Sequence, residues 1–228
     1  MRGHSIGGFG SVTTNKLVAT LVGEVFGKQV QAYPRYGSEK KGLPTTYYLT
    51  IADAPIRVHA ELDQVDFVPL HDVSAFDLGD PLAGLVDGGD LFIQSPLATP
   101  EAIWASIPAR SRAEILARRI RVTALDTAGL AQRHSPRPDL QLRMQGVALV
   151  GVFLRVAPFA AAAGMGRHRL LEAVGERLGR FFGKRGAGVV RANLAVIGEA
   201  WDGLIDVTGT VTGLDTNRTA RESEGVLL

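Results

Sequence analysis

Ser5-Ile6-Gly7-Gly8-Phe9-Gly10 is the stretch around which this chain is organised, and a helical pattern follows it from Ser11. Three glycines within four positions let the backbone approach a phosphate or another chain closely, because glycine has no side chain and adopts positive φ freely. The helix behind the loop offers unpaired N–H groups and the positive end of its dipole to an anion. A tight turn without a ligand is the alternative reading of the same residues.

The composition is that of a globular protein and narrows the possible functions. The 228 residues are 46% hydrophobic and 21% charged, with a formal net charge of +2. No nucleic-acid-binding module or stacking motif is visible, so nucleic acid is not an expected partner. The chain has no cysteine, which excludes disulfides, thiol catalysis and iron–sulfur clusters ligated by its own thiolates. No signal peptide follows Met1, and we expect a cytoplasmic protein.

Hydrophobic periodicity places strands and helices along the chain. A helix closed by Gly27 follows the glycine-rich stretch, and β-prone runs predict six strands, at residues 28–33, 45–51, 56–59, 66–70, 91–94 and 120–125. Short helices are predicted at residues 81–86, after the capping residue Thr99, and at the capping-box sequence Ser111-Arg112-Ala113-Glu114. Helical patterns then cover residues 140–157, 167–182 and 187–204.

This order indicates an α/β fold, with one three-layer domain, a mostly parallel sheet, the glycine-rich loop at the N-terminus and a helical C-terminal layer. The predicted domain spans residues 1–205, and residues 206–228 are expected to be an extended or disordered tail, because they lack apolar periodicity. A chain ending at Trp201 is therefore expected to keep its fold. Arg155 and Pro158 interrupt the apolar residues 144–165, which predicts a buried helix and a break instead of a membrane span.

Two segments of the chain are rich in basic residues. Arg35, Lys40 and Lys41 lie in the glycine-containing polar stretch 34–43, which suits phosphate groups, although a solvated loop is the alternative. Residues 167–191 contain seven Lys or Arg and two Glu, a pattern typical of a solvated helix face.

Catalytic and metal-binding motifs are not found. The five histidines lack metal-ligand spacing, and the chain has neither a G-x-S-x-G elbow nor the Gly-Lys-Ser/Thr of a Walker motif. A dinucleotide-binding fingerprint also needs an acidic residue for the ribose, and none ends the predicted strand at residues 28–33. We therefore predict no catalytic residue and no metal site in this chain.

Five short blocks resemble, in the same order, the gamma subunit (or third domain of fused versions) of pyruvate:ferredoxin oxidoreductase and its 2-oxoacid:acceptor oxidoreductase relatives. The family loop G-x-G-G-x-G matches residues 5–10, with Ser5 replacing the first glycine, and Thr14-Asn15-Lys16 resembles the Ala-Asn-Lys that follows it. The family's Q-A-Y/F-x-x-Y and the Asp-Ser-Lys-Lys-Ser-Gly after it match residues 31–42. Further similar blocks are residues 54–57, 124–128 and 182–193.

The resemblance implies a non-catalytic subunit of an enzyme that oxidatively decarboxylates a pyruvate-like 2-oxoacid to acyl-coenzyme A. It implies thiamine diphosphate, magnesium and iron–sulfur clusters in partner subunits, and ferredoxin or another electron acceptor. It implies assembly and coenzyme A binding for this chain, and the cofactor-binding candidates are Gly7, Gly8, Gly10, Ser38, Lys40 and Lys41. An NAD(P)-dependent Rossmann-like reductase and an assembly module without a ligand remain as alternatives.

Overall fold

The computed structural model describes residues 1–6, 11–36, 44–57, 60–135, 138–182 and 186–212. Within these ranges one seven-stranded sheet forms the middle layer, with the strand order β2-β3-β1-β4-β5-β6-β7. The strands are β1 (Arg2–Ile6), β2 (Gln29–Tyr36), β3 (Pro44–Ala52), β4 (Val65–Leu70), β5 (Leu85–Gln94), β6 (Arg121–Leu125) and β7 (Ile205–Asp206). The predicted α/β fold is confirmed.

The strand pairing is parallel in the centre of the sheet and antiparallel at both sides. Strands β1, β4, β5 and β6 run parallel to their neighbours in this group, as the alternation of strands and helices predicts. The hairpin β2–β3 joins β1 through the antiparallel pair β3–β1, and β7 adds to β6 in the antiparallel direction. Both ends of the sheet are thus closed by antiparallel strands.

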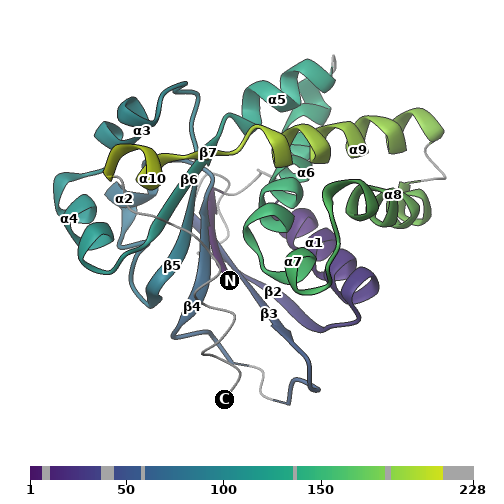
Figure 1. Ribbon diagram of the computed structural model, residues 1–228, viewed down its shortest axis with the longest axis horizontal. Helices are drawn as coiled ribbons and strands as arrows, with labels where there is room; N and C mark the ends of the chain where they lie inside the picture. Colours follow the sequence, from purple (N-terminus) through teal and green to yellow (C-terminus); the bar gives the residue numbers. More distant parts are fainter. Residues whose placement is uncertain (7–10, 37–43, 58–59, 136–137, 183–185, 213–228) are drawn as a thin grey trace.

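Helices cover both faces of the sheet, which gives the three predicted layers (Figure 1). One face packs against α1 (Ser11–Phe26), α5 (Thr127–His134), α6 (Pro138–Val156), α7 (Phe159–Ala162), α8 (Arg167–Phe182) and α9 (Ala187–Asp202). The other packs against α2 (Ala75–Leu78), α3 (Pro100–Ser106), α4 (Ala109–Ala117) and α10 (Val207–Thr212). Successive strand residues point to opposite faces, so that Phe67 joins the first core and Val68 the second.

Three local predictions are wrong. Residues 56–57 form no strand, since the chain bends at residues 53–54 after β3 and continues without regular structure; residues 58–59 lie outside the described residues. No helix forms at residues 81–86: Gly84 takes a φ of 69° in a turn, and β5 begins at Leu85. Helix α4 starts at Ala109 with Pro108 at its N-cap, ahead of the capping-box sequence at Ser111.

The tail predicted from residue 206 does not begin there, since residues 205–212 form β7 and α10. Val207 and Thr208 are fully buried, and α10 packs against α3 and β6. The sequence pattern missed this short helix because Thr and Gly separate its only apolar residues, Val207 and Val211. Residues 213–228 lie outside the described residues.

The apolar residues 144–165 form the predicted buried helix and break. Helix α6 ends at Val156, and Pro158 is the N-cap of the four-residue helix α7. Among the described helices, none combines the length and the hydropathy that a membrane span needs.

Candidate functional site

The two stretches proposed from the sequence to bind a ligand both begin at the ends of strands that flank β3 in the sheet. Ile6, the last residue before the glycine-rich loop, pairs with Pro44, the first residue after the basic loop. Tyr36, the last residue before the basic loop, pairs with Thr45. Paired strands lie about 5 Å apart. The start of the glycine-rich loop and both ends of the basic loop therefore lie at the same edge of the sheet.

The proposed cofactor-binding residues themselves lie outside the described residues, namely Gly7, Gly8, Gly10, Ser38, Lys40 and Lys41. Strand β2 extends through Tyr36, so the polar loop predicted at residues 34–43 begins later than expected. Arg35 belongs to this strand, is exposed and forms an ion pair with Glu61.

The position of this edge favours ligand binding for a topological reason. The chain leaves β1 toward the β2–β3 side of the sheet and leaves β4 toward β5, on the opposite side. The carboxyl ends of these two parallel strands lie together, and the N–H of His71, just after β4, donates to the carbonyl of His4 at 3.2 Å. In open α/β sheets, ligands bind in the crevice at such a switch point.

Buried polar side chains lie near the carboxyl ends of β1 and β4. Tyr47 packs its ring directly against Gly3, where a Cβ would come within 1.9 Å of the ring, and its hydroxyl is 3.4 Å from Nε2 of His71. Burial lowers the pKa of His71 to about 4. Burial, with a smaller contribution from the charge of Arg2, lowers the pKa of His4 to about 4. Both imidazoles are therefore neutral at pH 7 and contribute no positive charge at this edge of the sheet.

Asn15 connects the helix after the glycine-rich loop to the strand after the basic loop. Its side chain is 2% exposed, and its Nδ2 donates to the carbonyl of Tyr48 in β3 at 3.0 Å. From the sequence, Asn15 is only a part of Thr14-Asn15-Lys16, which resembles the family's Ala-Asn-Lys, and no role of its own is predicted. A polar residue next to the apolar stripe that begins at Leu17 was the signal that could have marked it as buried. Asn15 thus fixes α1 against the hairpin.

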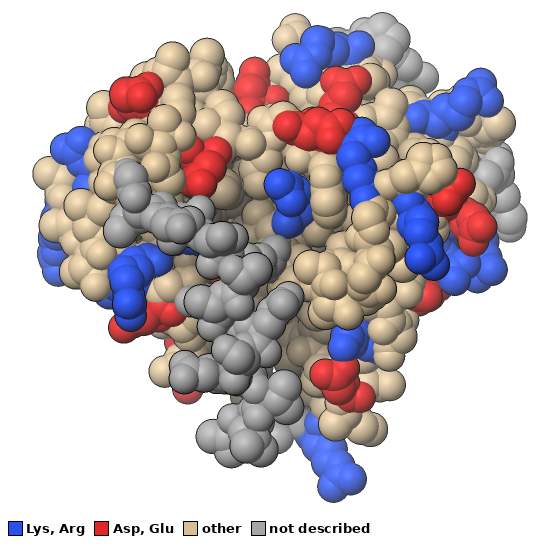
Figure 2. Space-filling view, in the orientation of Figure 1, with Lys and Arg blue, Asp and Glu red and all other residues tan. Residues whose placement is uncertain are grey.

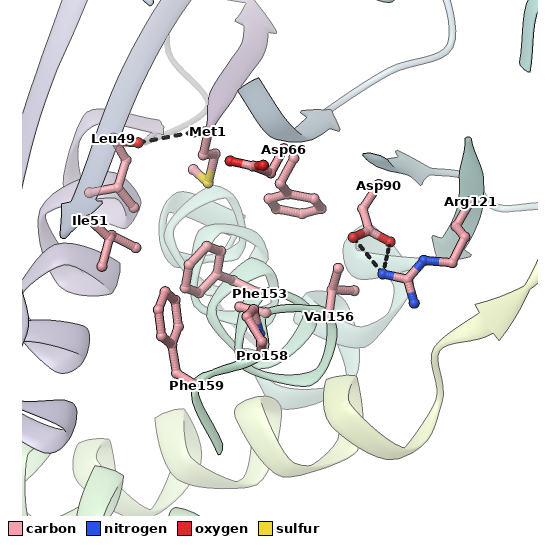
Figure 3. A pocket seen from close by; sticks show the side chains of 12 residues that line it. Met1, Leu49, Ile51, Asp66, Asp90, Arg121, Phe153, Val156, Pro158 and Phe159 are labelled. Atoms are coloured by element: carbon pink, nitrogen blue, oxygen red, sulfur yellow. Dashed lines mark hydrogen bonds and ion pairs between the residues drawn. The ribbon is translucent and has the colours of Figure 1, made fainter. Parts of the chain in front are cut away.

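A cavity that the sequence did not predict lies at the opposite edge of the sheet (Figure 3). It has a volume of about 310 Å³ and lies between the first residues of β1, β4 and β6 and the turn from α6 to α7. Arg121 donates from Nη2 to Oδ2 of Asp90 at 2.6 Å on one wall. Its lining comes from many separate elements, so no sequence spacing could have predicted it.

The described basic side chains of residues 167–191 are exposed, as predicted for a solvated face, except Arg177, which is half-buried. Arg167 pairs with Asp202, and Arg177 pairs with Glu24 on α1. Figure 2 shows Lys and Arg side chains beside Asp and Glu side chains over these helices. The described residues also contain no group of three or more His, Asp or Glu side chains that could hold a metal ion.

Comparison with known proteins agrees with the resemblance drawn from the sequence. Residues 1–202 match the family model described as pyruvate ferredoxin/flavodoxin oxidoreductase. The common subunit gamma of the pyruvate/ketoisovalerate oxidoreductases of Thermococcus kodakarensis is 36% identical over 103 residues, which are 45% of this chain and 55% of that protein. The chain spans between 10% and 55% of the length of the curated relatives it matches.

Two solved structures have a similar fold. The pyruvate oxidoreductase subunit PORC of Thermotoga maritima matches with a TM-score of 0.64 and 20% identity, over 90% of this chain and 95% of that chain. The 2-oxoglutarate:ferredoxin oxidoreductase of Magnetococcus marinus matches with a TM-score of 0.60 and 16% identity, over 87% of this chain and 29% of that chain. Because the family model covers nearly the whole described domain, this chain belongs to the pyruvate ferredoxin/flavodoxin oxidoreductase family.

Proposed function

We propose that this chain is the gamma-type, non-catalytic unit of a complex that oxidatively decarboxylates a 2-oxoacid and passes the electrons to ferredoxin or another acceptor. The family match over residues 1–202 is the observation that carries the proposal. The gamma subunit of Thermococcus kodakarensis and the similar fold of the Thermotoga maritima subunit support it. The cytoplasm is the expected compartment.

The proposed role of this chain is assembly together with binding of coenzyme A. The pairs Ile6–Pro44 and Tyr36–Thr45 bring the start of the glycine-rich loop and both ends of the basic loop together, and the 16-residue helix α1 follows the glycine-rich loop in the chain. Backbone N–H groups at a helix N-terminus and lysine ammonium groups both favour phosphate. Coenzyme A supplies the thiol that accepts the acyl group, and Lys40, Lys41 and the glycine backbone would hold its phosphates. The Magnetococcus marinus enzyme was solved with coenzyme A and succinyl-CoA bound.

Thiamine diphosphate, magnesium and the iron–sulfur clusters are assigned to partner subunits. Clusters of this kind are held by cysteine thiolates, and this chain has no cysteine.

Purification of the tagged full chain from its own organism tests the assignment. We expect a thiamine-dependent subunit and a cysteine-rich subunit to co-purify, together with 2-oxoacid- and coenzyme A-dependent reduction of an electron acceptor. The chain alone should show no turnover. Turnover by the chain alone, or saturable binding of NAD(P)H to it, would support the reductase instead, and a complex whose activity survives without this chain would contradict the proposal.

A further inference from the structure

The cavity at the amino-terminal edge of the sheet is separate from the proposed coenzyme A site, which lies at the carboxyl ends of the strands. Its floor is formed by β3 and the first residues of β1 and β4, and its roof by the end of α6 and the start of α7. Figure 3 shows Phe153 and Phe159 on the helical side, facing Ile51 and Met1 on the strand side. The volume of about 310 Å³ is at the lower end of the range of small-molecule pockets, roughly 300–1,000 Å³.

Aromatic rings form the apolar wall of this cavity. The ring of Phe153 lies 5.9 Å from that of Phe67 and 6.2 Å from that of Phe159, measured between centroids. Such rings pack well against another aromatic or aliphatic group, and their faces attract cations. The wall therefore suits a compact apolar body and tolerates a positive charge close to it.

The charged side chains at the cavity set the preferred sign of a ligand. The carboxylate of Asp90 is compensated by the guanidinium of Arg121, which contacts both of its oxygens. Asp66 is exposed at the rim and adds a second carboxylate. The side chains that line the cavity thus sum to one negative charge. The amino group of Met1 also lies at this cavity, and burial lowers its pKa to about 6 despite the nearby charge of Asp66, so it is mostly uncharged at pH 7. This balance opposes an anionic ligand and favours a cation.

We propose that this cavity binds a small organic cation with an aromatic or aliphatic body, in which the apolar part contacts the phenylalanines and the cationic group lies near Asp66. This binding site is independent of the proposed role in 2-oxoacid oxidation.

Three probes that share a phenethyl group and differ in charge test the site, namely phenethylammonium, 2-phenylethanol and 3-phenylpropionate. Each is titrated into the full chain and followed by two-dimensional amide NMR. We expect saturable shifts for residues such as Phe153 and Ala157, with a Kd on the order of 1 mM for the cation. The cation should bind about threefold more tightly than the alcohol, and the anion most weakly.

Two variants and a matched control separate the effect of charge on probe affinity from the effect of the cavity's space. Asp66→Asn should remove the advantage of the cation and leave the affinity for the alcohol unchanged, whereas Asp63→Asn, an exposed carboxylate outside the cavity, should change neither. Ala157→Leu narrows the cavity and should weaken all three probes. Shifts that do not saturate, equal affinities for the three probes in the unmodified chain, or an undiminished preference for the cation in Asp66→Asn would overturn the proposal. Because Asp66 is exposed, Asp66→Asn is expected to fold, and it tests the proposal even if Ala157→Leu does not fold.

Discussion

The hydroxyl of Thr208 accepts a hydrogen bond from the backbone N–H of Val122 at 3.1 Å, across 86 positions of the sequence. Both residues are fully buried. Strand β7 pairs with β6 only at Thr123 and Ala124. The preceding residue of β6, Val122, has no β7 partner in this register, and its N–H donates to the side chain of Thr208 instead. Helix α10 is therefore fastened to the sheet by a polar contact as well as by the packing of Val207.

Replacing Thr208 by Val should destabilise the protein by about 1–3 kcal/mol, because it leaves a buried N–H without an acceptor at nearly constant side-chain volume. Thr208→Ser keeps the hydroxyl and should retain most of that contribution. Thr210→Val, on the exposed side of the same helix, is the control and should stay within about 0.5 kcal/mol. Urea denaturation measures all three, and equal losses for Thr208→Val and Thr210→Val would show that the hydrogen bond is dispensable.

The position of a C-terminal truncation should decide whether the domain stays folded. A chain ending at Trp201 loses β7 and α10 and uncovers the apolar side chains they pack against; the loss of Val207 and of the Thr208 contact should together cost about 3 kcal/mol or more. This reverses the expectation drawn from the sequence. A chain ending at Thr212 keeps both elements and is expected to match the full chain. Thermal unfolding followed by circular dichroism distinguishes them, and similar midpoints for the two truncations would contradict this assignment.

Elements with strong local patterns could be predicted from the sequence, whereas those fixed by distant contacts could not. Helix α8 has the predicted bounds because its apolar and charged residues alternate at helical spacing. The hydroxyl of Thr99 caps α3 as predicted, accepting from the N–H of Ala102 at 3.3 Å. In contrast, β7 has two residues and depends on β6 for its hydrogen bonds, so its own composition says little.

The same distinction applies to the candidate sites. The sequence identified the glycine-rich and basic loops separately, but the register that brings their ends together depends on the antiparallel pairs of β3 with both β1 and β2. The burial of His71 was not predictable, because a single histidine after a strand has no periodicity to place it. Its environment comes from Tyr47 and Gly3, which are distant in sequence.

Acidification should destabilise the protein through His71. Burial lowers its pKa from 6.5 to about 4 in the folded chain, so below pH 6.5 the unfolded chain takes up a proton that the folded chain does not. The contribution of this imidazole to stability is complete above pH 6.5 and is lost as the pH falls toward 4. For one imidazole with this shift, the free energy of unfolding falls by about 2 kcal/mol between pH 7 and pH 5.

His71→Asn isolates this effect from the protonation of carboxylates. The substitution carries its own pH-independent cost, but the loss of stability between pH 7 and pH 5 should be smaller than in the unmodified chain by about 2 kcal/mol. His168→Asn, in which an exposed histidine is replaced, is the matched control and should keep the original pH dependence. Urea denaturation at the two pH values provides the comparison, and parallel pH profiles for His71→Asn and the unmodified chain would rule out the contribution of His71.

Lys40 and Lys41 should determine how the assembled enzyme uses coenzyme A. Changing both to Ala removes charge-assisted contacts to phosphate, each worth on the order of 1.5–3 kcal/mol when well placed, and solvent exposure reduces this. We expect the apparent KM for coenzyme A to rise about tenfold to a hundredfold, and the KM for the 2-oxoacid to change little. The effect should shrink at high salt, because screening weakens exposed charge pairs.

The matched control is Arg110→Ala with Arg169→Ala, which removes the same number of positive charges from exposed sites on α4 and α8. Steady-state kinetics of the reconstituted complex, at low and high salt, measure both double variants. If the Arg variant raises the KM for coenzyme A as much as the Lys variant, the effect comes from net charge and not from a phosphate site. If neither changes it at low salt, the basic loop does not contact coenzyme A, and assembly remains the role of this edge.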